Sequence, residues 1–226
     1  MTEPATVLEP EVTQGSSSRG LRLVLTVVVV VVALLVAGTV GWLIRGGGSS
    51  LVSASSVDAG FARDMATHHE QAVTMASYTR DHTDNAQIKT LAYDIEETQK
   101  FEVGRMSGWL DAWGLSRVDS SQAPMAWMGH DHMQMGAGNL MPGMATQQQM
   151  TELQSSTGTK LDILFLQLMI HHHQGGIPMA QYAAAHASKD YVRTAAQAMV
   201  TNQSSEIIAM GQLLRQLGGS ELQPPS

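Results

Sequence analysis

The sequence predicts an all-α protein: an antiparallel, ferritin-like four-helix bundle built from two duplicated helical hairpins and preceded by one N-terminal transmembrane helix. Three observations indicate this fold class. Residues 21–44 form a continuous apolar run, apolar residues recur at helical spacing further along the chain, and residues 61–114 align without a gap with residues 165–218. The only dense run of β-branched residues lies in the apolar segment, so no strands are expected.

The N-terminal part is predicted to be a cytoplasmic tail followed by a membrane anchor. Residues 1–20 are polar and lack periodicity, which is typical of disorder. Residues 21–44 are longer than the roughly 20 apolar residues that a helix needs to span a bilayer. The alternative is a cleaved signal peptide, but its apolar region has only about 7–15 residues, so a membrane anchor fits the length better. Arg19 precedes the run, Arg22 lies near its start and Arg45 follows it, so we expect a single-pass cell-membrane protein with a cytoplasmic N-terminus and an extracytoplasmic C-terminal domain.

Composition narrows the functions of this outer part. From residue 46 onward the chain has 10 Lys+Arg and 17 Asp+Glu, which accounts for the whole formal charge of −7 and argues against nucleic acid as a partner. The chain has no cysteine but 15 methionines. Because thiols oxidise outside the cytoplasm, thioethers suit a protein there that holds a soft metal. No nucleophile triad, phosphate loop or nucleotide fingerprint is visible, so we do not expect an enzyme, with weak redox activity at a bound metal left open.

A duplication is predicted to organise the outer part. At an offset of 104 residues, 15 of the 54 aligned positions in 61–114 and 165–218 are identical. The aligned copies contain the metal-ligand candidates Met65, His68, His69, Met75, Glu102, Met106, Met169, His172, His173, Met179, Glu206 and Met210. The expected segments are a tether over 45–57, a bundle over 58–218 with hairpins at 58–114 and 159–218 and a connector at 115–158, and a tail over 219–226.

Two carboxylates fall on the apolar stripes of the second helices. Glu102 and Glu206 are expected to point inward, and a carboxylate inside a bundle is costly unless it is paired or binds a cation. Two interpretations stay open. Glu102–His68 and Glu206–His172 could be structural hydrogen-bonded pairs, with the methionines as adaptable packing. Alternatively, each hairpin brings imidazole, thioether and carboxylate ligands together on a metal ion.

The residue types favour copper over other metals. A di-iron bundle needs about four inward glutamates with paired Glu-x-x-His motifs, and only Glu102 and Glu206 qualify. Zinc has little use for methionine, whereas thioethers combined with imidazoles select copper, above all Cu(I). The predicted cofactor is therefore a copper ion, with Cu(I) favoured over Cu(II) and with zinc and iron less favoured.

The connector carries its own candidate ligands. Seven of the 15 methionines lie between residues 124 and 150. The candidates there are His130, His132, Met133, Met135, Met141 and Met144. Because a loop has no core of its own to fill, we expect the connector to capture ions that the bundle then holds; a mobile hydrophobic cover over the bundle is the alternative. Pro178 predicts a kink or a loosened turn after His171–His173, so the two sites should differ.

The stretch MPGMATQQQMTELQSSTGTKLDILFLQLMIHHHQGGIPMA resembles the domain-of-unknown-function 305 family, whose hallmark is MPGM followed by F-x-x-x-M-I-x-H-H-x-G-A-x-x-M-A. The resemblance covers about 58–218 and implies a secreted or membrane-anchored ferritin-like bundle; some members are implicated in extracytoplasmic copper binding and tolerance. On the matching positions it implicates Met65, His68, His69, Met75, Met141, Met144, Met169, His172, His173 and Met179. His171 and residues 176–178 depart from the pattern, which affects the geometry of the second site.

The leading hypothesis is a membrane-anchored extracytoplasmic protein that uses Met/His sites for copper sequestration, tolerance or relay. Its partners would be metal ions and the lipid bilayer, the latter through residues 21–44. The alternative is a structural or interaction subunit beside a membrane protein complex, whose histidines only pair with glutamates. Bound metal would identify the first, whereas a stable metal-free fold and a co-purifying membrane protein would identify the second.

Overall fold

The computed structural model describes residues 30–34, 52–129, 135–136 and 139–223. The chain divides into two units, Met1–Leu51 and Val52–Ser226. In the first unit the described residues 30–34 are helical, and the rest of the predicted tail and anchor lies outside the described residues. None of the helices in the described part is both long enough and apolar enough to cross a membrane.

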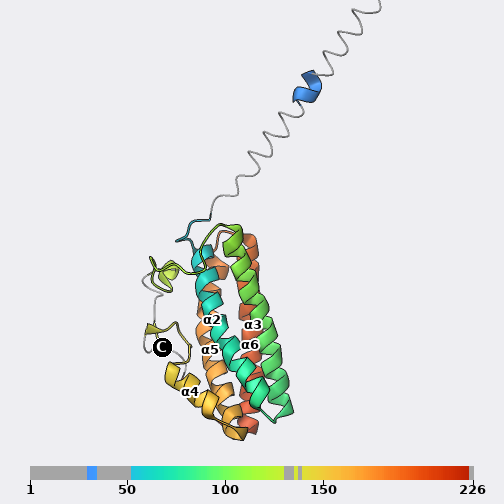
Figure 1. Ribbon diagram of the computed structural model, residues 1–226, viewed down its shortest axis with the longest axis vertical. Coiled ribbons are helices and arrows are strands. Elements are labelled where there is room, and N and C mark those ends of the chain that lie inside the picture. The colour runs from blue at the N-terminus through green and yellow to red at the C-terminus, as the bar shows by residue number, and fades with distance from the viewer. Residues whose placement is uncertain (1–29, 35–51, 130–134, 137–138, 224–226) are drawn as a thin grey trace, which may run out of the picture. The chain divides into compact units, whose positions relative to one another are not determined.

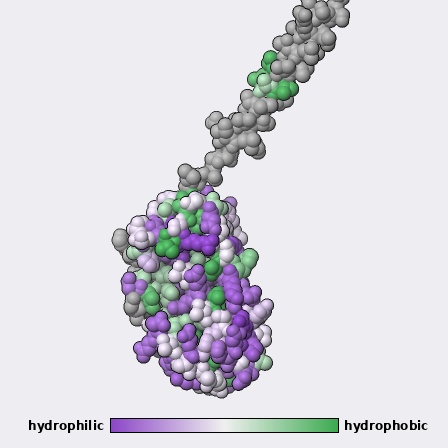
Figure 2. Space-filling view, viewed as in Figure 1, coloured by the Kyte–Doolittle hydropathy of each residue, from purple (hydrophilic) through white to green (hydrophobic). Residues whose placement is uncertain are grey.

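The second unit is helical throughout its regular elements, which confirms the predicted all-α class. Its elements are α2 (Val57–His82), α3 (Ala86–Ala112), the 3₁₀ turn η1 (Ala126–Met128), α4 (Gln147–Ser155), α5 (Gly158–His186) and α6 (Asp190–Gln216). The long helices α2, α3, α5 and α6 lie side by side (Figure 1). The face seen in Figure 2 is mostly hydrophilic with small separate hydrophobic patches, because the apolar residues are turned inward.

Local sequence explains where several helices begin. Ser56 caps α2 by accepting a hydrogen bond from the Ala59 backbone N–H, and Asn85 caps α3 in the same way. Thr146 and Gln149 form a capping box at the start of α4, a helix within the segment expected to be connector only. Pro178 lies inside α5, which continues to His186.

Two buried clusters show how the long helices run. The first joins the beginning of α2 and α6 to the end of α3 and α5 and includes Met65, Met106, Met179 and Met199; we call it the methionine-rich end. The second joins the other ends of the same helices and includes Met75, Ile95, Met169 and Met210; we call it the opposite end. Because the beginning of α2 shares a cluster with the end of α5, these two helices are antiparallel, as are the helices within each hairpin.

Candidate metal centre

Four histidines meet between the two clusters, in the middle of the bundle. His68 and His69 come from α2, His172 and His173 come from α5, and all four are 0% exposed. The centroids of the His68 and His172 rings lie 3.8 Å apart, with the ring planes tilted by 39° to each other. Within each pair the rings are further apart. The ring centroids of His68 and His69 are separated by 6.4 Å, and those of His172 and His173 by 6.2 Å. The antiparallel packing of α2 on α5 therefore unites the two histidine pairs.

The second histidine of each pair is hydrogen-bonded to a carboxylate of the next helix. His69 Nε2 lies 2.7 Å from Glu102 Oε2, and His173 Nε2 lies 2.6 Å from Glu206 Oε2. The expected pairs, Glu102 with His68 and Glu206 with His172, are therefore wrong by one residue. His69 and His173 face the partner helix of their own hairpin, whereas the first histidine of each pair faces the other hairpin.

The first histidine of each pair is bound to backbone carbonyls instead. His68 Nε2 donates to the carbonyl of Pro142 at 3.0 Å, and His172 Nε2 donates to the carbonyl of His68 at 2.9 Å. The MPGM segment of the connector thus reaches the centre of the bundle. It packs tightly against α5, because a Cβ atom added to Gly175 would lie 2.0 Å from the Pro142 oxygen.

These bonds determine which ring nitrogen of each histidine carries the proton. Carbonyl and carboxylate oxygens can only accept, so Nε2 is the donor in all four rings. In the neutral ring, Nδ1 then presents a bare lone pair, and none of the four Nδ1 atoms has a hydrogen-bond partner. A metal-binding histidine typically donates its other ring N–H to a carboxylate or a backbone carbonyl, as all four do here.

Burial keeps two of these rings neutral. Desolvation lowers the pKa of His68 to about 3, with the neighbouring His69 and His173 adding to the shift and the bond to Pro142 opposing it. Desolvation, followed by repulsion from the other three histidines, also holds the pKa of His172 well below its usual value. The Nδ1 atoms of His68 and His172 are therefore unprotonated at neutral and mildly acidic pH.

Two glutamines that we did not predict as site residues add unpartnered polar atoms. Gln99 on α3 and Gln203 on α6 are 2% and 3% exposed, and neither amide group has a hydrogen-bond partner. A Cβ atom added to Gly176 would lie 3.0 Å from Gln203 Oε1 and 3.2 Å from His68 Cε1. The residue aligned with Gly176 is Ala72, so the two halves of the centre differ by a methyl group. The sequence does contain a signal for them, because the 104-residue offset aligns Gln99 with an identical residue, Gln203.

The helical methionines among the candidates are all buried, but they do not gather within one hairpin. Those in the methionine-rich end are Met65, Met106 and Met179. Those in the opposite end are Met75, Met169 and Met210. Ten residues of α2, or about 15 Å of helix, separate Met65 from Met75, so these two cannot share one ion. The candidates one turn from the histidines are Met65 and Met169.

The described part of the connector covers the methionine-rich end. Met141 is buried, and Met135 and Met144 pack against the cluster there. The expectation that connector methionines have no core to fill is therefore wrong for these three, because they contribute to the core of the bundle. His130, His132 and Met133 lie outside the described residues.

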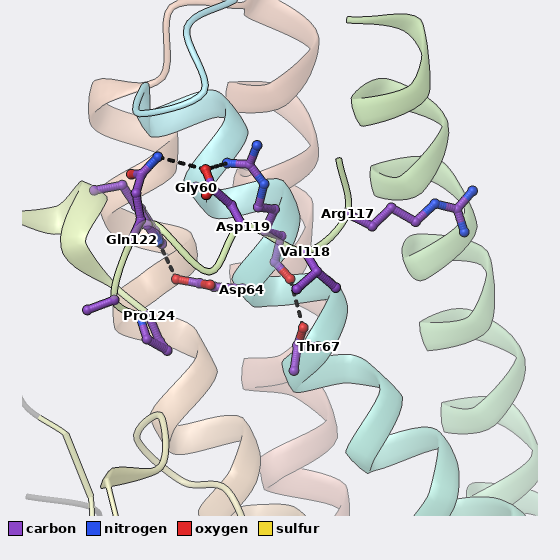
Figure 3. Close-up of a pocket in the computed structure, with 11 residues that line it drawn as sticks. Gly60, Asp64, Thr67, Arg117, Val118, Asp119, Gln122 and Pro124 are labelled. Atoms are coloured by element: carbon purple, nitrogen blue, oxygen red, sulfur yellow. Dashed lines mark hydrogen bonds and ion pairs between the residues drawn. The ribbon is translucent and has the colours of Figure 1, made fainter. Parts of the chain in front are cut away.

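Asp64 fastens the connector to α2. Its Oδ2 accepts hydrogen bonds from the Met125 backbone N–H at 2.6 Å and from the Trp127 indole N–H at 2.7 Å. Figure 3 shows Asp64 pointing from α2 toward the segment that contains Pro124. Desolvation raises the pKa of Asp64 against the opposing effect of these bonds. The adjoining pocket, about 170 Å³ in volume, has no histidine or methionine among its described lining residues, so it is distinct from the histidine centre.

The histidines and carboxylates at the centre do not by themselves form a complete metal site. Among the residues that the structure describes, no three His, Asp or Glu side chains converge in a metal-binding arrangement. A metal held by these residues would therefore need methionine sulfur in addition to imidazole nitrogen.

Comparison with known protein families places the helical bundle in one of them. The profile of a domain of unknown function, DUF305, matches residues 58–214. The chain belongs to the DUF305 family. A DUF305 crystal structure from Streptomyces coelicolor, described as a secreted protein, is 43% identical, covers 76% of this chain and 99% of that chain, and has a TM-score of 0.70. A DUF305 fragment from Deinococcus radiodurans is 25% identical, covers 71% and 96% of the two chains, and has a TM-score of 0.59.

A more distant protein with the same fold has been solved with bound metal ions. CopM in the Cu(I)-bound form is 22% identical, covers 72% of this chain and 98% of that chain, and has a TM-score of 0.55. CopM is also similar to this chain in its Cu(II)-bound and Ag-bound forms. At this identity the likeness establishes the fold alone. A comparison with curated proteins gives no match.

Proposed function

We propose that this DUF305 protein is a membrane-anchored, extracytoplasmic copper-binding protein that sequesters or relays Cu(I). The observation that carries the proposal is the set of four buried imidazoles whose Nε2 atoms are hydrogen-bonded and whose Nδ1 atoms have no hydrogen-bond partner. An unpaired buried polar atom costs about 1–3 kcal/mol. A metal ion accepts a lone pair without needing a hydrogen, so it would offset this cost at each Nδ1 that it reaches. Because no three His, Asp or Glu side chains of the described residues converge on one point, methionine sulfur would have to complete the ligand set.

The residues around the histidines support a soft ion. Thioethers and imidazoles together favour copper, and Met65 and Met169 lie one turn from the histidine pairs. CopM, which shares the fold, has been crystallised with Cu(I) and with Ag, another soft ion. Glu102 and Glu206 would fix the orientation of His69 and His173, because each carboxylate accepts the Nε2–H of its histidine.

The placement of the site outside the cytoplasm rests on sequence and on one relative. The apolar run 21–44 is long enough for an anchor, and the relative from Streptomyces coelicolor is described as secreted. The absence of cysteine also suits an oxidising compartment. The packed connector would shield the methionine-rich end from water, so that capture of an ion at that end requires the connector to lift.

A second candidate function is a structural or interaction subunit without metal. The formed pairs His69–Glu102 and His173–Glu206 favour it, because they could serve only to fix each hairpin. It leaves the four unpartnered Nδ1 atoms and the amides of Gln99 and Gln203 without a role. The two candidates differ in whether the purified protein takes up copper.

A competition titration tests the proposal. The full chain in detergent is titrated with Cu(I) against a chromophoric chelator without oxygen, with Zn(II) and Fe(II) in parallel. We expect tight Cu(I) binding that weakens by more than roughly 100-fold when His68 and His172 are both changed to leucine, because changes to outer partners alone cost 10–100-fold. The control is H82A/H186A, which removes two exposed histidines and should leave the affinity unchanged.

Circular dichroism establishes that each variant is folded before its affinity is compared. Unchanged Cu(I) affinity in folded H68L/H172L would reject the central site and shift the search to the connector residues His130 and His132. If the wild-type chain fails to compete with the chelator, the copper proposal fails and the structural subunit becomes the better account.

A further inference from the structure

Three aromatic side chains and one arginine form a row along the outer side of α3. Phe101, Arg105, Trp109 and Trp113 follow each other at four-residue spacing, which places them on one face of the helix. Tyr191, from the first turn of α6, extends the row. We call these five residues the aromatic stripe. Phe101 is 68% exposed and Tyr191 is 47% exposed, although aromatic rings are normally buried in a core.

Contacts among its members hold the aromatic stripe in a fixed arrangement. Arg105 Cζ lies 5.4 Å from the centroid of the Phe101 ring and 5.5 Å from that of Trp109. The rings of Trp109 and Trp113 are stacked, with centroids 6.3 Å apart, and Trp113 Nε1 donates to the Tyr191 hydroxyl at 3.0 Å. Phe101 and Tyr191 are the most exposed rings of the aromatic stripe, and Trp109 and Trp113 are partly buried against the bundle. The aromatic stripe is therefore an ordered surface, which costs little entropy to bring against a partner.

The chemistry of the aromatic stripe matches the membrane–water interface. Tryptophan and tyrosine gather there because each ring has an apolar body and a polar edge. Arginine can reach the same zone with an apolar stem and a charged head, but Arg105 Nη2 lies 3.6 Å from Glu102 Oε1, so the match to the interface comes from the tryptophan and tyrosine rings. The chain from residue 46 onward is net negative, with 17 acidic and 10 basic residues, so attraction to anionic lipids is not what would hold it there.

The length of the chain before the bundle brings a lipid surface within reach. Val52, Trp109 and Trp113 all pack against the cluster of the methionine-rich end. Residues 45–51 are all that separates Val52 from the apolar run that ends at residue 44. Such a segment spans at most about 30 Å even when fully extended. With residues 21–44 in a membrane, the end of the bundle that carries Trp109 and Trp113 must stay near its surface.

We infer that the aromatic stripe rests on the outer surface of the bilayer, with its tryptophan and tyrosine rings at the level of the lipid headgroups. This inference rests on the proposed anchor over 21–44 and goes beyond it by assigning a lipid-contacting face to the bundle itself. The contact holds α3 against the lipid and keeps the methionine-rich end, with its connector cover, beside the membrane.

Tryptophan quenching by brominated lipid tests this inference. The full chain is reconstituted in phosphatidylcholine vesicles with or without lipid brominated near the headgroup end of its acyl chains. The W42F/W127F variant leaves Trp109 and Trp113 as the only tryptophans, and its emission should fall with bromination. A variant that retains only Trp42 reports on the anchor, and one that retains only Trp127, which is 7% exposed, should be unaffected.

A matched pair of surface changes sharpens the test. In the W42F/W127F background, Phe101→Ser should reduce the quenching, whereas Ile208→Ser, which alters a similarly exposed residue of α6, should not. Quenching of Trp42 without quenching of Trp109 and Trp113 would overturn the inference and leave the anchor standing. No quenching of Trp42 would remove the anchor and the inference together. Emission that depends on protein density instead of bromination would assign the stripe to a second copy of this chain and overturn the lipid contact.

Discussion

The metal-free protein should lose stability steeply as the pH falls from about 6.5 toward 3. His68 and His172 are neutral when folded, and the pKa of His68 is lowered to about 3 by burial. In the unfolded chain both rings take up protons near pH 6.5. Below that pH the unfolded state binds more protons than the folded state, so the free energy of unfolding decreases with acidification. Each histidine contributes about 1.4 kcal/mol per pH unit, or roughly 2.7 kcal/mol for the two.

This loss is large beside the roughly 5–15 kcal/mol that stabilises a typical domain. Denaturant unfolding of the metal-free chain at several pH values between 7 and 4 measures the slope. The variant H68Q/H172Q should have a shallower slope by about 2.7 kcal/mol per pH unit, whereas H82Q/H186Q, which alters exposed histidines, should match the wild type. Equal slopes in all three proteins would show that the central rings are not held neutral.

Removing either Glu102 or Glu206 should weaken Cu(I) binding by 10–100-fold, in line with the usual cost of losing the hydrogen-bond partner of a metal-binding histidine. Glu102→Ala deprives the His69 Nε2–H of its acceptor, and Glu206→Ala does the same for His173. Each ring is then free to rotate or to move its proton to Nδ1, which takes the lone pair from the metal. The effect of Glu102→Ala should be the larger, because the Glu102 side chain is 8% exposed whereas that of Glu206 is 23% exposed and water can more easily replace it.

The chelator competition described above measures both affinities. Glu97→Ala serves as the control, since Glu97 is on α3 like Glu102 but has a side chain that is 52% exposed and lies 3.5 Å from Lys100. Its affinity for Cu(I) should equal that of the wild type. If folded Glu102→Ala and Glu206→Ala also bind Cu(I) as tightly as the wild type, then His69 and His173 do not act as ligands.

Local patterns were sufficient to predict the helical class and the burial of the four histidines at the centre, but not the part of Gln99 and Gln203. Apolar spacing indicates which face of a helix is buried, and the repeated His-His and Glu positions marked the polar residues on those faces. The same patterns could not tell His68 from His69 as the partner of Glu102. Adjacent helical residues differ by about 100° in direction, so the choice depends on how α2 is rotated between α3 and α5.

The direction of α5 relative to α2 was equally beyond the sequence. Met65 and Met75 lie about 15 Å apart on α2 by helix geometry, but which residues of α5 share a cluster with each depends on the direction in which α5 runs. The docking of the connector was missed because it depends on non-local contacts, such as those of Asp64 with Met125 and Trp127. Asp64 aligns with Leu168 in the second copy, so the repeat gave no signal for it.

The central claim is that Cu(I) is bound through Nδ1 of the buried histidines while each Nε2 keeps its proton. Two-bond ¹H–¹⁵N correlation spectra of the histidine-labelled full chain, recorded without metal and with Cu(I), test it directly because Cu(I) is diamagnetic. We expect the Nδ1 resonances of His68, His69, His172 and His173 to shift on copper addition and their Nε2 resonances to remain those of protonated nitrogens. Copper-induced shifts confined to other histidines, or loss of the Nε2 protons on binding, would contradict the account.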